Sequence, residues 1–409
     1  MTLWTPKATP QVPDQPEPTP QPAVPGLGPA LLALIVSQLG LHSAMAGLRM
    51  AAPLLALREG WSAMTVGVLM ALFAVAPVLL ALPAGRMADR HGYHRPVRVA
   101  VSLTLTGVLV ALAATWGEGT IQFAALCLAA TLTGAGTNIG LIAIQRTAGQ
   151  AAMDSVQRMR VFSWLGMAPS LSNVIGPVIA GFAIDAAGFR VAFAVLLLLP
   201  IVSLVAARRV PRSQRSPVRV PQTGAAWELL ALPGLKRLMM VNLLLSACWD
   251  VHTFAVPVLG HERNFSASTI GLILGSFTLA VTAIRLVIPL LAHRMREVVV
   301  LRVAMVGTGL VFAAYPFATS PWLMGVLALC LGVTLGSVQP VIMSGLHHLT
   351  PTTRHGEAIA LRSIVINLSS SVLPLVFGAA GAAVGVAALF WSVGSATAVG
   401  SWPARRLRI

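Results

Sequence analysis

The sequence contains very few charged residues and, among them, very few acids. Of its 409 residues, 10% are charged, 12 are Asp or Glu, and 56% are hydrophobic. Soluble domains carry about 25% charged residues. A water-soluble chain of this length would need many more polar side chains to cover the surfaces of two or three domains. The composition therefore excludes an ordinary soluble protein.

Features that would indicate a metal site or an enzyme are also scarce. Cys127, Cys248 and Cys330 lie in apolar stretches without paired spacing, so they predict neither a disulfide framework nor a zinc site. No Gly-x-x-x-x-Gly-Lys-Ser/Thr phosphate loop occurs, and no segment between the apolar stretches is long enough to form a catalytic domain. We expect no metal, no cofactor and no enzyme activity.

What the sequence does contain is a series of apolar runs of about 20 residues, the length that spans a hydrocarbon core about 30 Å thick. They predict an all-α membrane protein with twelve transmembrane helices. The expected helices are 27–57, 64–83, 97–116, 121–144, 161–184, 191–207, 238–260, 270–292, 298–318, 322–346, 358–380 and 386–402.

The formal charge of +16 comes from arginines that are concentrated in alternate connections and in the terminal segment. The opposite connections hold only Arg58, Arg190 and Arg263. This asymmetry is the positive-inside pattern, and it predicts that both termini lie in the cytoplasm. The bias toward Arg over Lys and toward Ala is typical of a GC-rich bacterial genome, so we expect the bacterial inner membrane. The arginines do not alternate with aromatic residues along a stripe, so we expect no nucleic-acid partner.

The longest polar connection divides the chain into two groups of six helices. We expect a disordered cytoplasmic tail over 1–26, a six-helix bundle over 27–207, a cytoplasmic linker over 208–237, a second bundle over 238–402 and a short cytoplasmic tail over 403–409. The tail lacks the basic region, short apolar region and cleavage site of a signal peptide.

An internal repeat supports this division. Residues 61–67 recur as 265–271, a shift of 204 residues (265 − 61), and three later residues recur with a shift of 197 (374 − 177). The later pairs are Pro177 and Pro374, Gly181 and Gly378, and Gly188 and Gly385. Six spans are an even number, so both repeats have the same orientation. Such parallel repeats place a substrate site between the halves, near the midplane.

The connection between the second and third helices carries a motif. Gly85, Asp89, Arg90 and Gly92 match the loop signature of the major facilitator superfamily, which this chain resembles, although Tyr93-His94 replace its basic pair. The resemblance implies that fold, secondary transport and a cytoplasmic gate. In that gate Asp89 would meet the N-terminus of the eleventh helix and a basic side chain, for which Arg146 is our candidate. A solvated loop acid is the alternative. We expect Gly85 to permit close helix approach or unusual backbone angles.

The fifth helix is similar to the antiporter motif of drug:proton exporters at Gly176, Pro177 and Gly181. Generic tight helix packing explains these residues equally well. Ala130 stands where those exporters usually carry an arginine, so their proton mechanism is not transferred intact.

Ionisable residues at membrane depth usually face a partner or a water-filled cavity. Asp250 in the seventh helix is the strongest candidate, because the repeat places it within about one turn of Arg49 in depth. We expect a pair across the cavity, formed by Asp250 with Arg49 or Arg285. His42 is either a second proton carrier or a packing residue.

Three further polar residues lie in these helices. Asn367 is a candidate for substrate binding or coupling. Arg362 is expected to extend to the membrane interface, and His252 points about 200° away from Asp250 and is expected to pack.

These features predict a monomeric transporter that moves a small organic solute by alternating access between its halves. We expect coupling to protons through Asp250, with export favoured over uptake. A cationic substrate could take the arginine's place beside this acid. Proton symport or uniport of a metabolite is the alternative within transport. A non-transporting membrane sensor is the alternative from another class, although buried charges on facing helices argue against it.

Overall fold

The computed structural model describes residues 27–151, 155–211, 226–232, 234–291, 297–350, 355–405 and 407. The first half contains α1 (Leu27–Arg58), α2 (Ala63–His91), α3 (His94–Ala114), α4 (Gly119–Ala151), α5 (Ser155–Leu196) and α6 (Leu198–Ala207). The second contains α7 (Leu235–Glu262), α8 (Ala267–Leu291), α9 (Glu297–Ala314), α10 (Pro321–Gly336), α11 (Val338–Leu349), α12 (His355–Val384) and α13 (Val386–Ala404). Two short 3-10 helices, η1 (Ala226–Ala231) and η3 (Tyr315–Phe317), accompany them. The expected tail over 1–26 and residues 212–225 of the expected linker lie outside the described residues.

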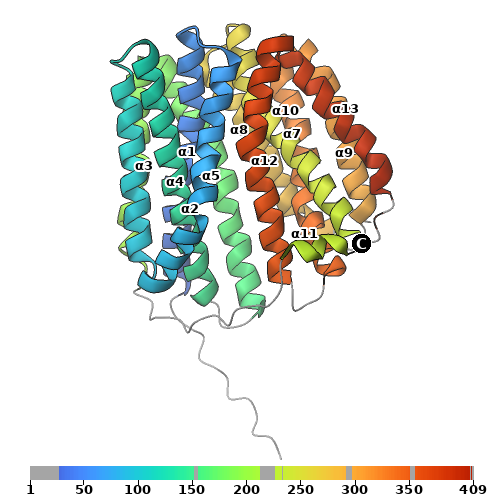
Figure 1. Ribbon diagram of the computed structural model, residues 1–409. Helices are drawn as coiled ribbons and strands as arrows, with labels where there is room; N and C mark the ends of the chain where they lie inside the picture. The colour runs from blue at the N-terminus through green and yellow to red at the C-terminus, as the bar shows by residue number, and fades with distance from the viewer. Residues whose placement is uncertain are drawn as a thin grey trace, which may run out of the picture.

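The described residues form helices and no strand, as a membrane span requires, because a helix satisfies its own backbone hydrogen bonds in lipid. Within the described part of the chain, ten stretches are long and apolar enough to cross a membrane. One of them, 164–207, holds two spans, because Gly188 adopts a φ of 81° and turns the chain back. Positions on both sides of this turn, Gly176 and Leu196, pack against Gly47 of α1. With α13, which packs beside α7 and α9, the spans confirm the predicted all-α fold (Figure 1).

Two helix boundaries differ from those expected. The expected helices 161–184 and 191–207 follow each other with only a short break at Gly188, which lies within α5, and the second is divided near residue 197 between α5 and α6. The expected single helix 322–346 is interrupted at Ser337, which separates α10 from α11. Pro340 lies four residues after Gly336 and has no N–H to donate to the Gly336 carbonyl oxygen, so the helical hydrogen bond is missing at this point.

The two groups of helices meet through contacts that repeat. Packing of α5 against α8 is matched by packing of α12 against α2, and both pairs lie where the differently coloured groups meet in Figure 1. A Cβ on Gly67 would lie less than 3.0 Å from the Pro374 carbonyl oxygen, and a Cβ on Gly271 equally close to that of Pro177. Because these residues are repeat partners, the internal repeat builds the same glycine contact on both sides of the interface.

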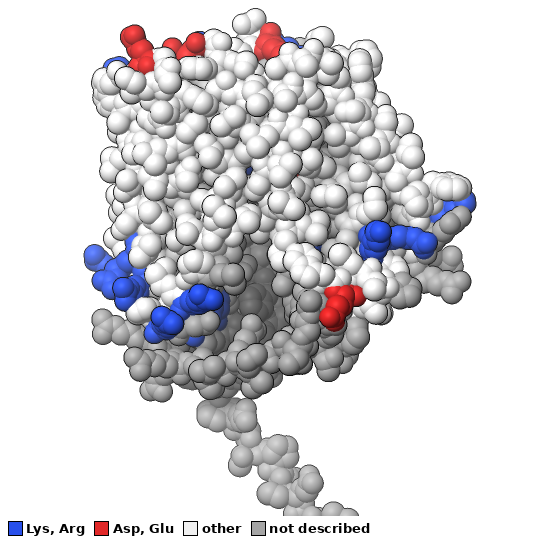
Figure 2. Space-filling model, in the orientation of Figure 1, with Lys and Arg blue, Asp and Glu red and all other residues white. Residues whose placement is uncertain are grey.

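The two ends of the bundle differ in charge. In Figure 2 most of the Lys and Arg side chains in view lie at the lower, arginine-rich end, and most of the acids in view lie at the upper, acid-bearing end. At the acid-bearing end the Asp185 carboxylate of α5 accepts from the backbone N–H groups of Ala267 and Ser268, at 2.9 and 2.7 Å. It therefore caps the first turn of α8 in the other half. At the acid-bearing end this cap joins α5 of the first half to α8 of the second.

Candidate functional site

A cavity of about 350 Å³ lies between the two halves. Its walls come from α1, α5, α7, α8, α10, α11 and α12. The residues that line it are Arg49, Pro169, Ser170, Asn173, Asn242, Leu245, Ser246, Trp249, Asp250, Arg285, Leu335, Val338, Gln339, Arg362, Ile366 and Ser370. The volume is at the lower end of the usual range for ligand pockets, about 300–1,000 Å³.

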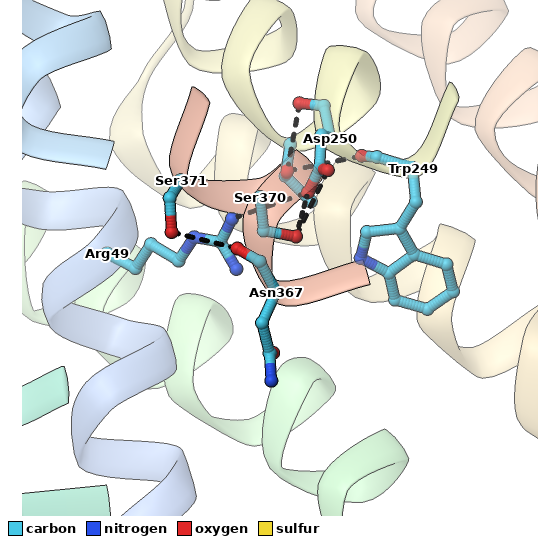
Figure 3. Close-up of polar contacts among 7 residues, drawn as sticks. Arg49, Trp249, Asp250, Asn367, Ser370 and Ser371 are labelled. Atoms are coloured by element: carbon cyan, nitrogen blue, oxygen red, sulfur yellow. Dashed lines mark hydrogen bonds and ion pairs between the residues drawn. The ribbon is translucent and has the colours of Figure 1, made fainter. Parts of the chain in front are cut away.

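Asp250 is the one acidic residue in this wall, and its side chain is only 5% exposed. The Ser370 hydroxyl of α12 donates to both carboxylate oxygens, at 3.2 and 3.1 Å. Arg49 of the opposite half places its Nη2 atom 3.9 Å from Oδ1, as Figure 3 shows. At this distance the two groups form an ion pair, but the two atoms are too far apart for a hydrogen bond. The pair therefore joins the halves through charge and leaves room for either group to exchange its partner.

Arg285 lies on the same cavity but does not pair with Asp250 in the described structure. Its Nη1 donates to the Ser170 hydroxyl at 3.0 Å and its Nη2 to Gln339 Oε1 at 2.7 Å. The structure thus selects Arg49 from the two partners expected for Asp250. Arg285 instead links α5 of one half to α11 of the other.

Arg362 corrects an expectation. It does not extend to the membrane interface, because its Nε donates to Asn242 Oδ1 at 3.1 Å and its side chain lines the cavity. Ile366 and Ser370 follow at intervals of four residues on α12 and line the same cavity. This spacing puts all three on one face of the helix.

Asn367 and His42 lie apart from the residues that line the cavity. Asn367 is exposed, and its side-chain amide points away from Asp250 in Figure 3. Its backbone carbonyl oxygen accepts from the Ser371 hydroxyl at 2.8 Å. His42 is partly buried on α1, and its Nδ1 has no partner within the described residues. His252 is fully buried and bonds through Nε2 to the Tyr315 hydroxyl at 3.1 Å, so it packs within the second half.

The gate residues are only partly described. Gly92 ends α2 with a φ of 66°, a left-handed conformation that favours glycine. Gly85 is different from what was expected: it lies inside α2, and a Cβ there would meet no atom of the described residues within 4 Å. Arg90 is exposed and Arg146 is partly buried. The side chain of Asp89 lies outside the described residues, so its partner stays a prediction.

The packing motif of α5 contacts two neighbouring helices, α1 and α8. A Cβ on Gly176 would lie 2.6 Å from the Gly47 nitrogen of α1, and one on Gly181 would lie 2.5 Å from the Ala267 oxygen of α8. Pro177 presents its carbonyl oxygen to Gly271, also on α8. These small residues bring α5 close to its own half and to the other half at once.

Several residues of the cavity were not expected from the sequence, among them Trp249, Gln339, Asn173 and Ser370. The repeat contains a signal for two of them. Asn173 and Ser370 are related by the shift of 197 residues (370 − 173), and both line the cavity from equivalent helices. Applying the repeat to polar residues, and not only to glycines and prolines, would have found this pair.

Similar structures were found among solved proteins. A POT family transporter in complex with a thioalcohol-conjugated peptide has a TM-score of 0.75 at 12% identity, over 91% of this chain and 94% of that one. A bacterial homologue of the iron transporter ferroportin, in an inward-facing state, has a TM-score of 0.71 at 17% identity, over 93% and 100%. A bacterial metal transporter has a TM-score of 0.66 at 16% identity, over 92% and 98%.

Sequence comparisons agree with the fold. No curated protein matches the chain, whereas the family model described as Major Facilitator Superfamily matches residues 26–248 and 238–407. These two matches cover both halves and include every residue of the cavity. The chain, a multi-pass membrane protein with the fold of secondary transporters, belongs to the Major Facilitator Superfamily.

Proposed function

We propose that the chain is a proton-coupled secondary transporter of a small organic solute that works by alternating access. The halves 27–207 and 238–402 would move against each other around the cavity, with 208–237 as their linker. The observation that carries the proposal is the buried ion pair between Arg49 and Asp250, which come from opposite halves. Ionisable groups at membrane depth mark coupling sites in transporters.

The proton step follows from the environment of Asp250. Burial favours the neutral form of a carboxylate, and a neighbouring arginine favours the ionised form. Movement of α1 away from α7 would remove the arginine and make protonation easier. Protonation of Asp250 would in turn release Arg49, so the proton and the motion of the halves are coupled.

The direction of transport is the least constrained part of the proposal. The partial fifth-helix motif favours export, and its glycines pack α5 against α1 and α8. Proton symport is the second candidate, because protonation of Asp250 frees an arginine that a substrate could then occupy. A non-transporting sensor would have little reason to retain this pair in a cavity.

The nature of the solute needs support beyond the fold. Solved relatives include POT family proteins in complex with a peptide conjugate and with 5-aminolevulinic acid. Others are homologous to an iron transporter or described as a metal transporter. One fold serves all of these solutes, so the choice depends on the cavity.

For location we propose the bacterial inner membrane, with the arginine-rich end and both termini in the cytoplasm. We propose that the protein works as a monomer surrounded by lipid, without a metal or a cofactor.

The proposal is tested by solute-induced proton movement. Purified protein is reconstituted into liposomes that contain a pH-sensitive dye, and organic acids, amino acids, sugars and amphipathic amines are added in turn. At least one class should change the internal pH with wild-type protein and not with empty liposomes. If no class moves protons but some solutes equilibrate, the protein is a uniporter. If none crosses, the sensor alternative is favoured.

A further inference from the structure

The charge of the cavity wall is strongly unbalanced. Three arginines, Arg49, Arg285 and Arg362, line it together with a single acid, Asp250. The net charge of the wall is therefore +2, and it becomes +3 when Asp250 is protonated. A cavity with this charge repels cations and concentrates anions.

The arginines also have unused hydrogen-bond donors. Within the described residues, the bond from Nε to Asn242 is the one that Arg362 makes, so its two terminal nitrogens remain available. Within the described residues, the Nε atoms of Arg49 and Arg285 and the Nδ2 atom of Asn242 are buried without a hydrogen-bond partner. A buried donor without a partner is destabilising, and an acceptor bound to such a donor removes that cost.

The bonds that Arg285 and Arg362 do make hold their side chains in place. Ser170 and Gln339 fix Arg285 from two sides, and Asn242 fixes Arg362. Both arginines line the same cavity. Guanidinium groups match carboxylate and phosphonate oxygens with two parallel hydrogen bonds. Two guanidinium groups fixed in one cavity wall provide a site for such an anion.

The remaining wall suits an organic group. Trp249, Leu245 and Ile366 contribute apolar surface to the same cavity, and the Trp249 ring is itself supported by Phe277, with ring centroids 4.6 Å apart. An inorganic anion would leave this surface without a partner. A small organic anion fills both parts of the cavity.

We propose that the transported solute is a small organic anion, a carboxylate or a phosphonate, whose charged group binds between Arg285 and Arg362 and whose apolar part packs against Trp249. The inference rests on the proposed function and replaces the cationic substrate that Asp250 alone suggested. Because protonation of Asp250 frees Arg49, the proton and the anion favour each other's binding. The Ser370 hydroxyl on α12 also contacts Asp250, and Arg285 on α8 and Arg362 on α12 line the same cavity. None of the described groups in this wall is a second acid or a histidine.

One experiment measures the charge of the cavity without knowing the solute. Ser246 lines the cavity and is partly exposed, whereas Thr120 is exposed in the first turn of α4 at the acid-bearing end. Single cysteines at these positions, in protein without the native cysteines, are reacted with an anionic (sulfonatoethyl) and a cationic (trimethylammonioethyl) methanethiosulfonate. The ratio of anionic to cationic rate should be about tenfold or more higher at Ser246→Cys than at Thr120→Cys. Adding Arg285→Gln and Arg362→Gln should lower it about tenfold, and Arg302→Gln, on the exposed face of α9, should not.

A second experiment identifies the chemical class. Succinate, phosphonoacetate and longer carboxylates are compared with their amide and amine counterparts in thermal-shift assays at two pH values. Anions alone should raise the melting temperature, more at the lower pH, and the shift should disappear with Arg285→Gln and Arg362→Gln but persist with Arg302→Gln. An equal ratio of anionic to cationic reagent rates at both cysteines would overturn the inference. Stabilisation by amines or amides only would also overturn it.

The two experiments separate this inference from the proposed function. Anion binding without proton-driven flux would leave the anion site standing and refute the coupled transport. Proton-driven flux of a cation or a neutral solute would support the coupled transport and refute the anion site.

Discussion

Removal of the charge on Asp250 separates a coupling residue from a structural one. Asp250→Asn keeps the shape and the bond from Ser370, which can still donate to the amide oxygen, and it abolishes the ion pair with Arg49. If Asp250 couples transport to protons, this variant should lose accumulation driven by a pH gradient but retain exchange of solute across the liposome membrane. If the pair only holds the halves together, both activities should change together.

The size of the effect on stability follows from the geometry. Two unit charges 3.9 Å apart interact by about 4 kcal/mol at an effective dielectric constant of about 20. The Arg49 side chain is 23% exposed and makes no hydrogen bond to the acid, so about 2 kcal/mol is the expected net coupling. With an unfolding entropy of about 2.1 cal/mol/K per residue over 409 residues, this corresponds to about 2–3 °C in melting temperature.

A double-mutant cycle provides the matched control. Asp250→Asn and Arg49→Gln should each lower the melting temperature, because each leaves a buried charge without its partner. The double variant should regain most of that loss. The coupling hypothesis expects the stable double variant to remain unable to use a pH gradient. The measurement is uptake of the anion that gives the largest thermal shift. Gradient-driven accumulation with wild-type pH dependence in Asp250→Asn would refute the reasoning, and His42 would be the next candidate.

Three further predictions concern the fold and its movement. Cysteines introduced at Arg86 and Glu118, in a cysteine-free background, should differ in their labelling in spheroplasts. An impermeant maleimide should label only position 118, and labelling of position 86 would reverse the proposed orientation. Gly67→Val should force α2 from α12 and lower the melting temperature by several degrees, whereas Gly85→Val, with open space around it, should change it by less than about 1 °C; equal effects would contradict the close contact. Asp89→Ala should slow transport at near-normal expression and make cysteines on the arginine-rich halves of α4 and α10–α11 more accessible; unchanged flux and accessibility would make Asp89 a surface acid.

The fold could be read from the sequence because its determinants are local or repeated. A span needs about 20 apolar residues whatever its neighbours are, and the side of each connection follows from its arginines. The repeat also indicated which helices of the two halves are equivalent. Gly188 and Gly385, which are repeat partners, share the same left-handed backbone, with φ values of 81° and 84°. Breaks inside spans were less predictable. Pro340 has no N–H to donate to the carbonyl of Gly336, next to the interruption at Ser337, whereas Pro53 and Pro257 lie inside unbroken helices. Packing therefore decides which proline interrupts a span.

The site shows where sequence reasoning ends. The sequence placed Asp250 and Arg49 at a similar depth on facing helices, because residue number determines depth along a helix. It did not determine the direction in which each side chain points: one residue turns a helix face by 100°, and helix packing sets which face meets the cavity. The tertiary structure therefore decided that Arg49 and not Arg285 faces Asp250, that Arg362 lines the cavity and that Asn367, five residues further on, does not. The net charge of the cavity depends on exactly these orientations, which is why the anion site emerges only from the folded chain.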